Sequence, residues 1–119
     1  MACDIYSPCA MGGVLSPTTI GELHCAAVVG SANNQLADPS CDERLAEAGV
    51  MYAPDYIVNA GGIVQLIGLE DEGWDESQLG ERLAAIGDTL RALFTEANAD
   101  GITPAEAADR LVRRRLAAA

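Results

Sequence analysis

Short apolar segments alternate with amphipathic ones along the first two-thirds of the chain. The segments Asp4–Ser7 and Cys25–Val29 have the length of β-strands, and the second is apolar at every position. Continuous apolarity is typical of a strand that is covered on both faces, as in a parallel sheet. Tyr56–Val58 is a third strand candidate, and Asn59–Gly62 closes it.

Helices are predicted between these strands, because N-cap residues are followed by proline. Ser16-Pro17 predicts a short helix that extends to about Leu23, and Asp38-Pro39 predicts another that stops before Gly49. Gly49 is a plausible C′ glycine of that second helix. The order strand, helix, strand, helix, strand predicts right-handed crossovers and a parallel sheet.

The last third of the chain is predicted to be helical. Asp75 and Gln78 resemble a capping box at the start of a long helix. Apolar residues then recur every three or four positions, which forms one stripe on an amphipathic helix: Leu79, Leu83, Ile86, Leu90, Leu93 and Ala97. Gly80 and Gly87 lie beside this stripe, so we expect another element to approach the helix closely there.

A final helix is predicted after Asn98–Gly101. Thr103, Pro104 and Glu106 form a capping box with proline at the first helical position. Arg113–Arg115 falls in the last turns, where cations suit the helix dipole and a solvated helix end is expected. The pattern therefore predicts an α/β fold with three layers, in which a parallel-stranded part over residues 1–70 is followed by a helical segment over residues 71–119, packed as one structural unit.

Composition excludes several functional classes. The 119 residues carry a formal net charge of -11, and all seven basic residues are arginines. The acidic balance argues against a nucleic-acid partner. The lack of lysine excludes a lysine Schiff base or a lysine general base from this chain. No apolar run approaches the roughly 20 residues of a membrane helix, and no signal peptide is recognised, so we expect a cytoplasmic protein with no membrane partner.

Metal binding is not indicated either. The four cysteines form no C-x-x-C pair, and His24 is the only histidine. Zinc sites usually have closer pairs of ligands, so buried cytosolic thiols are the favoured interpretation. Glu70–Glu72 is interpreted as a solvated turn.

Three loops rich in small and amide residues are the candidate site. They are Pro8–Gly13, Gly30–Gln35 and Asn59–Gly62, and each follows a predicted strand. In a parallel sheet these loops share one edge, where ligands bind in the crevice. Glycine lets a ligand approach the backbone, and asparagine supplies donors and an acceptor without charge. Glycine and asparagine also occur in ordinary tight turns, but three loops at one edge favour a ligand site.

Known catalytic and phosphate-binding motifs are absent from the sequence. We find no G-x-G-x-x-G or G-x-x-x-x-G-K-[ST] phosphate loop and no G-x-S-x-G nucleophile elbow. The loops therefore predict one half of a site, without a phosphate-binding loop or a catalytic base, and no catalytic residue is assigned.

The same loops resemble a known family. Asp4–Gly13, Gly30–Ala37, Tyr52–Gly62 and Asp100–Leu111 are similar, in that order, to the C-terminal part of the NAD-dependent Glu/Leu/Phe/Val amino-acid dehydrogenases. The resemblance is closest to the leucine, valine and phenylalanine members, and Ile86–Leu90 leans toward the phenylalanine branch. It implies the second half of a Rossmann-type NAD-binding domain, and an enzyme that deaminates an L-amino acid oxidatively to a 2-oxo acid with hydride transfer to NAD.

The resemblance also implies roles for residues of the first two loops. Cys9, Ala10 and Met11 would line the nicotinamide-ribose side of a cofactor cleft. Asn33 and Asn34 would hold the nicotinamide carboxamide, the ribose or the amino end of the substrate, and these roles cannot be divided between the two residues.

The substrate pocket would be formed by the third loop and the residues after it. Asn59, Gly61 and Gly62 would border the pocket, and Ile63 and Leu66 would line its side-chain end. Both lining residues are large and aliphatic, which favours a branched aliphatic substrate, because an aromatic one would prefer a smaller residue at Ile63.

The chain departs from the family pattern in what precedes these motifs. In the family, the glycine-rich loop, the catalytic lysines and the catalytic aspartate lie upstream of every motif present here. We therefore expect the isolated chain to bind NAD weakly or not at all and to be inactive. The alternative is a non-catalytic α/β module that self-assembles or complements a missing N-terminal half. A weaker third interpretation is a small independent nucleotide-binding domain.

Overall fold

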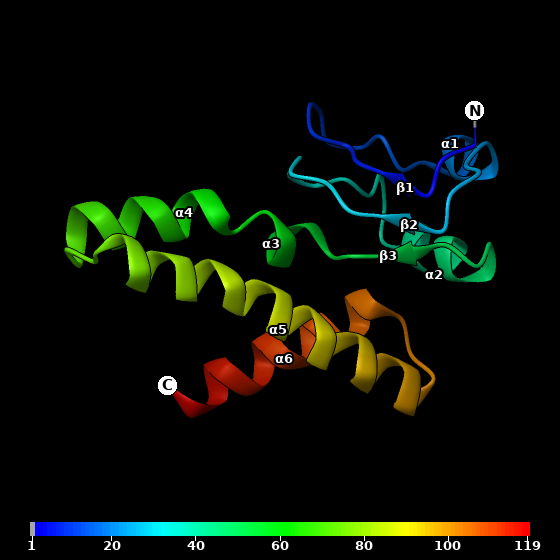
Figure 1. Cartoon of the computed structure of the whole chain (residues 1–119). Helices are drawn as coiled ribbons and strands as arrows, with labels where there is room; N and C mark the ends of the chain where they lie inside the picture. Colours follow the sequence, from blue (N-terminus) through cyan, green and yellow to red (C-terminus); the bar gives the residue numbers. More distant parts are fainter. Residues whose placement is uncertain (1) are drawn as a thin grey trace.

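The computed structural model describes residues 2–119, and Met1 lies outside the described part. The elements are β1 (Ile5–Tyr6), α1 (Pro17–Gly21), β2 (Ala27–Val28), α2 (Ser40–Glu47), β3 (Met51–Tyr52), α3 (Asp55–Val58), α4 (Gly61–Leu66), the π-helix η1 (Ile67–Asp71), α5 (Glu76–Asp100) and α6 (Pro104–Ala118). The strands and the helices α1 and α2 gather at one end, and the helices α4 and α5 extend away from them as a hairpin (Figure 1).

The sheet is parallel, as predicted, with the strand order β1-β2-β3. Ile5 pairs with Ala27, which pairs with Met51, and the next residues along the strands, Tyr6, Val28 and Tyr52, are paired in the same way. The strands are shorter than expected. Of the predicted strand Cys25–Val29, only Ala27 and Val28 pair in the sheet.

One face of the sheet carries the core. Val28 and Tyr52 are buried with residues of the two crossover segments, in a cluster completed by Leu15, Ile20, Cys41, Leu45 and Val50. Successive right-handed crossovers in one direction place their helices on the same side of a sheet. The opposite face leaves Ile5 and Met51 58% and 52% exposed, so residues 2–119 do not provide the expected cover on both faces.

The prediction of the third strand at Tyr56–Val58 is wrong. Tyr56–Val58 lies in the short helix α3, and the third strand is formed by Met51–Tyr52, just before it. Pro54 has no N–H to donate to a sheet, so a strand does not continue through it. Instead, its carbonyl accepts from the N–H of Ile57 and begins a helical turn. Asn59–Gly62 therefore joins two helices rather than following a strand.

The predicted helix starts and ends are confirmed, with small shifts. Ser16 with Thr19 and Asp75 with Gln78 form reciprocal capping boxes. The second helix begins at Ser40 rather than Pro39, and the Asp38 carboxylate accepts from the Ser40 N–H at 2.9 Å. Gly49 has the left-handed φ of +71° that the C′ position requires.

The helix α6 is held against the end of α5. Leu93 and Ala97 of α5 are buried against Ala107 and Ala108 of α6. Thr103 caps α6 by accepting from the Glu106 N–H, but the Glu106 carboxylate pairs with Arg110 and does not return to the N-cap.

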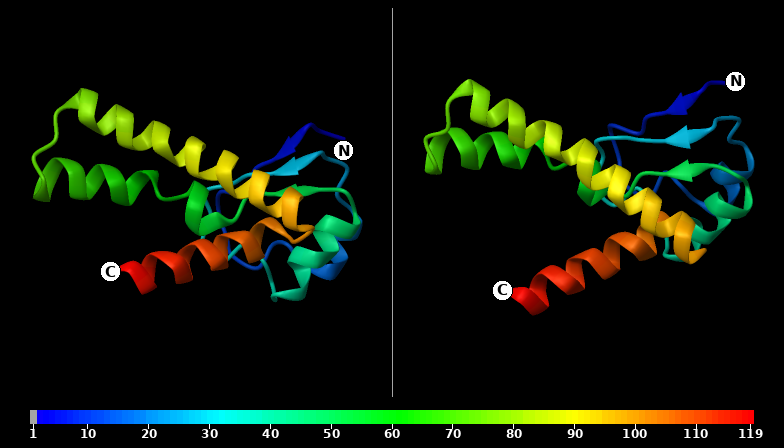
Figure 2. Two further views of the ribbon diagram at one scale, coloured as in Figure 1. Left: turned by 90° about the horizontal axis from the view of Figure 1, so that it is seen from below. Right: turned by 60° about the horizontal axis from the view of Figure 1, so that its bottom comes forward.

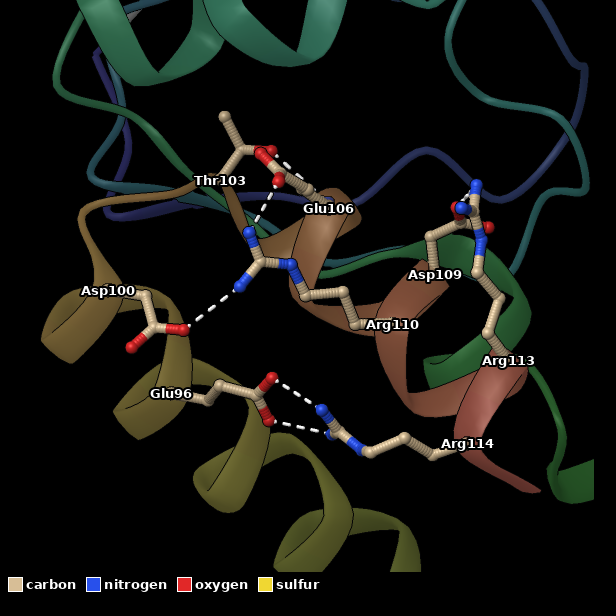
Figure 3. Close-up of polar contacts among 8 residues, drawn as sticks. All are labelled: Glu96, Asp100, Thr103, Glu106, Asp109, Arg110, Arg113 and Arg114. Carbon is tan, nitrogen blue, oxygen red and sulfur yellow. Dashed lines mark hydrogen bonds and ion pairs between the residues drawn. The ribbon is translucent and has the colours of Figure 1, made fainter. Parts of the chain in front are cut away.

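Ion pairs add to this contact between the two helices. Arg114 donates two hydrogen bonds of 2.8 Å to the Glu96 carboxylate, and Arg110 bridges Asp100 and Glu106 (Figure 3). The expectation that Arg113–Arg115 forms only a solvated helix end is therefore wrong for Arg114, because tertiary packing brings Glu96 of α5 opposite it.

The glycines of α5 do not mark a close approach. A Cβ at Gly80 would meet no atom within 4 Å, and one at Gly87 would meet only the Arg91 guanidinium, at 3.8 Å. Although α4 runs alongside this part of α5 (Figure 2), a Cβ at either glycine would meet no atom of α4 within 4 Å. Residues 2–119 hold no helix that is both long and apolar enough to cross a membrane.

The close approach of Gly30 to Pro8 predicts a stability difference between two glycine substitutions. A Cβ at Gly30 would overlap the carbonyl oxygen of Pro8 and lie 2.6 Å from its Cδ. Gly30→Ala is therefore expected to lower the free energy of unfolding by about 2 kcal/mol. The control Gly80→Ala should raise it by about 1 kcal/mol, because that position is open and helical. Urea unfolding followed by circular dichroism measures both, and equal effects would contradict the Pro8–Gly30 contact.

Candidate functional site

The loops after β1 and β2 lie against each other, backbone to backbone. The Gly13 N–H donates to the Asn34 carbonyl at 2.7 Å. A Cβ at Gly12 would lie 2.8 Å and 2.9 Å from the carbonyl oxygens of Asn33 and Asn34. Only glycine fits at Gly12, and this close approach places the two loops side by side at the carboxyl ends of their strands.

The third segment joins this contact through side chains. The Asn59 Nδ2 donates to the Asn33 Oδ1 at 2.6 Å, although the two residues are 26 positions apart. Asn34 adopts the left-handed conformation, with φ of 52°, which asparagine tolerates better than most residues. The structure therefore brings the three predicted segments together, even though the third begins a helix and does not follow a strand.

A buried amide and a carboxylate hold the second loop in place. The Gln35 side chain is fully buried, and its Nε2 donates to the carbonyls of Gly30 and Ala32 at 2.7 Å and 2.9 Å. The Gln35 N–H donates to the Asp55 Oδ2 at 3.1 Å, which ties the loop to the start of α3. The sequence analysis assigned no role to Gln35 or Asp55. The only sequence signals for these roles are that Gln35 follows the asparagine pair and that Asp55 follows Pro54.

Cys9 is the most chemically distinctive of the predicted residues. Its side chain is exposed, and its Sγ lies 3.3 Å from the Ser7 hydroxyl. Hydrogen bonds from the Ser31 side chain, the Ser7 hydroxyl and the Ser31 backbone lower the pKa of Cys9 from 9.0 to about 7. Hydrogen bonds to the thiolate favour the charged form, so this rim carries a partly ionised thiol at neutral pH.

The residues assigned to a substrate pocket lie on α4 and the turn before it. Ile63 and Leu66 are 58% and 52% exposed, so the described part of the chain does not enclose them. Gly61 faces α5, because a Cβ at Gly61 would meet the Leu83 Cδ2 at 3.6 Å. A Cβ at Gly62 would meet no atom within 4 Å. Ala10 and Met11 are exposed on the first loop. The described part of the chain therefore leaves most of the predicted pocket and ribose-side residues exposed.

Metal ligands are not grouped in the described structure. Residues 2–119 contain no cluster of three or more His, Cys, Asp or Glu side chains that could hold a metal ion. The arrangement offers amide groups, close backbone approach and an apolar helix face, which suit an uncharged polar ring or amide.

The environment of Cys9 predicts a pH dependence of its alkylation. Iodoacetamide should label Cys9 with a half-maximal rate near pH 7, because the thiolate is the nucleophile and its pKa is lowered to about 7. Ser31→Ala removes the largest stabilising hydrogen bond and should move this midpoint toward pH 9. Mass spectrometry of the labelled peptide measures the rate, and Ser77→Ala in α5 is the matched control. A midpoint that Ser31→Ala leaves unchanged would contradict the assigned contact.

Comparisons with known proteins place the chain among amino-acid dehydrogenases. All residues 1–119 match the family described as "Glutamate/Leucine/Phenylalanine/Valine dehydrogenase". The valine dehydrogenase of Streptomyces albus is 48% identical over 116 residues, which cover 98% of this chain and 32% of that protein. The phenylalanine dehydrogenase of Thermoactinomyces intermedius is 47% identical over 115 residues, covering 97% and 31% of the two chains.

A solved structure shows the same arrangement of elements. The L-tryptophan dehydrogenase of Nostoc punctiforme superposes with a TM-score of 0.90 and 40% identity, over 97% of this chain and 35% of that one. The chain thus spans about a third of the length of the relatives it matches. Since the family match runs from the first residue to the last, the chain belongs to the glutamate/leucine/phenylalanine/valine dehydrogenase family.

Proposed function

We propose that this chain is the second half of a Rossmann-type NAD-binding domain in an L-amino-acid dehydrogenase. Residues 1–70 would form that half, and residues 71–119 a helical segment that packs on it. The observation that carries this proposal is the convergence of the Gly12, Asn33 and Asn59 segments at one edge of a parallel sheet. Such an edge is where open α/β sheets bind their ligands.

The residues of this edge fit a nicotinamide nucleotide. Gly12 has no side chain at a position where one would collide with the carbonyls of the second loop. The first loop can therefore pack closely against the second. Asn33 and Asn34 offer amide donors and acceptors for a carboxamide, a ribose or a substrate amino group. Cys9, Ala10 and Met11 would flank the nicotinamide ribose, where the bound cofactor would accept the hydride.

The substrate side would be formed by α4. Ile63 and Leu66 present aliphatic side chains from the helix that follows Asn59, and Gly61 and Gly62 leave room at its start. The preferred substrate would be a branched aliphatic L-amino acid, converted to its 2-oxo acid. This chain has no lysine, so the catalytic lysines of the family would be supplied from outside these 119 residues.

A second function is compatible with the first, namely association with another polypeptide. β1 is an edge strand of the sheet, and the exposed Ile5 and Met51 share its open face. An unpaired edge strand with apolar neighbours favours pairing with a further strand. That strand would come from a complementing N-terminal half or from a second copy of the chain.

Activity assays test the proposal at two levels. The isolated chain should show no turnover with NAD and valine, leucine or phenylalanine, because it lacks catalytic lysines. A chimera of the Streptomyces albus valine dehydrogenase, in which this chain replaces the matching 116 residues, should be active. In that chimera Gly12→Ala should reduce valine oxidation roughly 100-fold, by displacing the loop that would position the cofactor, whereas Gly80→Ala should not. A folded but inactive chimera would contradict the proposal.

The chimera also tests the substrate pocket. Ile63→Ala should raise the ratio of kcat/KM for phenylalanine over valine by at least roughly tenfold, because an apolar pocket discriminates by the volume it leaves. Leu116→Ala, an exposed change on α6, is the control and should leave the ratio unchanged. Steady-state kinetics with both amino acids measure this ratio of kcat/KM. An equal ratio in the two variants would contradict the assignment of Ile63 to the pocket.

A further inference from the structure

The corner between α4 and α5 is built around a single tryptophan. α4 continues into the π-helix η1, which ends at Asp71, and Trp74 comes just before Asp75, the N-cap of α5. Trp74 is half-buried, and it is the only tryptophan of the chain. Neither the cofactor loops nor the substrate pocket of the proposed function includes this corner, so its construction needs its own explanation.

Trp74 lies directly on a glycine of η1. A Cβ at Gly68 would lie 2.3 Å and 2.9 Å from the Cε3 and Cζ3 atoms of Trp74, so only glycine fits beneath the indole. The Trp74 N–H also donates to the Gly68 carbonyl at 2.8 Å. Among residues 61–71 only Gly68 is buried, and the indole is the group that lies over it.

The backbone around this contact is shaped to accept it. The Glu72 N–H donates to the Ile67 carbonyl at 3.0 Å, five residues earlier instead of the four of an α-helix. Gly73 then has a φ of +63°, a left-handed conformation that glycine adopts without strain. The wide turn and the left-handed glycine together bring the indole back over Gly68. Such π-helical turns are rare, and they occur frequently at functional sites.

The same indole also contacts α5. The guanidinium carbon of Arg82 lies 5.2 Å from the centroid of the Trp74 ring, which is a cation–π arrangement. The ion pairs formed by residues 2–119 do not include Arg82, so this ring is the partner that the described structure gives to its charge. Because Gly68 belongs to η1 and Arg82 to α5, Trp74 joins the end of the segment of residues 61–71 to α5.

The segment of residues 61–71 is held on α5 at both of its ends. At its start, a Cβ at Gly61 would meet the Leu83 Cδ2 at 3.6 Å, and at its end lies the indole contact. Ile63 and Leu66 lie between these two points, and more than half of each side chain is exposed. The placement of these two side chains therefore depends on the backbone that the two contacts hold, and not on their own burial.

We propose that Trp74 is a positioning residue that sets the substrate preference, by fixing where Ile63 and Leu66 stand in the pocket. This inference rests on the proposed function, which assigns these two side chains to the side-chain end of the substrate pocket. Trp74 itself does not touch the substrate, because its indole acts through Gly68 and Arg82. Since an apolar pocket discriminates by the volume that it leaves, a shift of this segment changes which amino acid fits.

Fluorescence of the full chain tests the indole contact itself, since Trp74 is its only tryptophan. Gly68→Ala should displace the indole and raise its acrylamide quenching constant at least roughly twofold, because overpacking forces side chains out of place. The matched control is Gly80→Ala, whose added Cβ would meet no atom within 4 Å, and it should leave quenching unchanged. Equal quenching in the two variants would overturn the proposal, because the indole would then not rest on Gly68.

Kinetics of the valine dehydrogenase chimera test the positioning. Trp74→Ala and Gly68→Ala should each raise KM for valine at least roughly fivefold and leave kcat within about twofold, because the side-chain pocket supplies binding that substrate and transition state share. KM for NAD should stay unchanged. A loss of folded protein would instead lower kcat and leave KM unchanged. Trp74→Phe keeps an aromatic ring over Gly68 and should restore KM for valine to near the parent value.

The two substitutions should not add, because they break the same contact. The three atoms nearest to a Cβ at Gly68 all belong to Trp74. Once Trp74→Ala has removed the indole, Gly68→Ala should therefore change KM for valine by less than roughly twofold. Additive effects of the two substitutions would show that they act separately and would overturn the proposal.

Failure of this inference is distinguishable from failure of the proposed function. If the parent chimera is folded but inactive, the proposed function fails and this inference fails with it. If the parent is active, and Trp74→Ala and Gly68→Ala keep its KM for valine or raise KM for NAD equally, only the positioning role is wrong. Should Trp74→Ala fail to fold, Trp74→Leu, which keeps an apolar side chain without the flat ring, should raise KM for valine in the same way.

Discussion

The structure depends on the contact between the loops that follow β1 and β2. Gly12 lies directly on the backbone of Asn33 and Asn34, and Gly30 lies on Pro8 in the same way. These contacts need bare backbone on one side, which only glycine provides. Behind them, the buried Gln35 fixes the carbonyls of its own loop, and Asp55 connects that loop to α3. This small network holds the second loop in place and ties it to α3.

The order of the parallel strands explains the uneven cover of the sheet. Both crossovers run in the same direction from β1 to β3, so α1 and α2 pack on one face and build the core around Val28 and Leu45 there. The other face keeps exposed apolar residues, and β1 remains an edge. Relatives that are three times as long have further chain to place against such surfaces, and our proposal of a complementary half follows from this geometry.

Charge is distributed as unevenly as the apolar surface. Three of the seven arginines, Arg110, Arg113 and Arg114, neutralise carboxylates on α5 and α6, and Arg91 pairs with Asp88. Among residues 2–119, no ion pair involves the acidic residues of α2 or of the start of α3. Exposed ion pairs contribute little to stability, so the arginines mainly orient α6 on α5.

The sequence alone determined the local features of this protein. The capping residues Ser16, Asp75 and Thr103 located three helix starts, Gly49 and Gly101 located two helix ends, and the apolar segments located two of the three strands. These signals are local, because a cap or a positive φ depends on a few neighbouring residues. The family resemblance also rests on sequence, since its motifs are contiguous.

Tertiary structure decided what depends on residues far apart in the chain. The third strand was misplaced, because a short apolar run after Pro54 suits a helix or a strand equally well until its partners are known. Arg114 contacts Glu96 and Asn59 contacts Asn33 across 18 and 26 positions of the sequence. None of these contacts has a signature in the sequence, because burial and charge pairing depend on which surfaces the fold brings together.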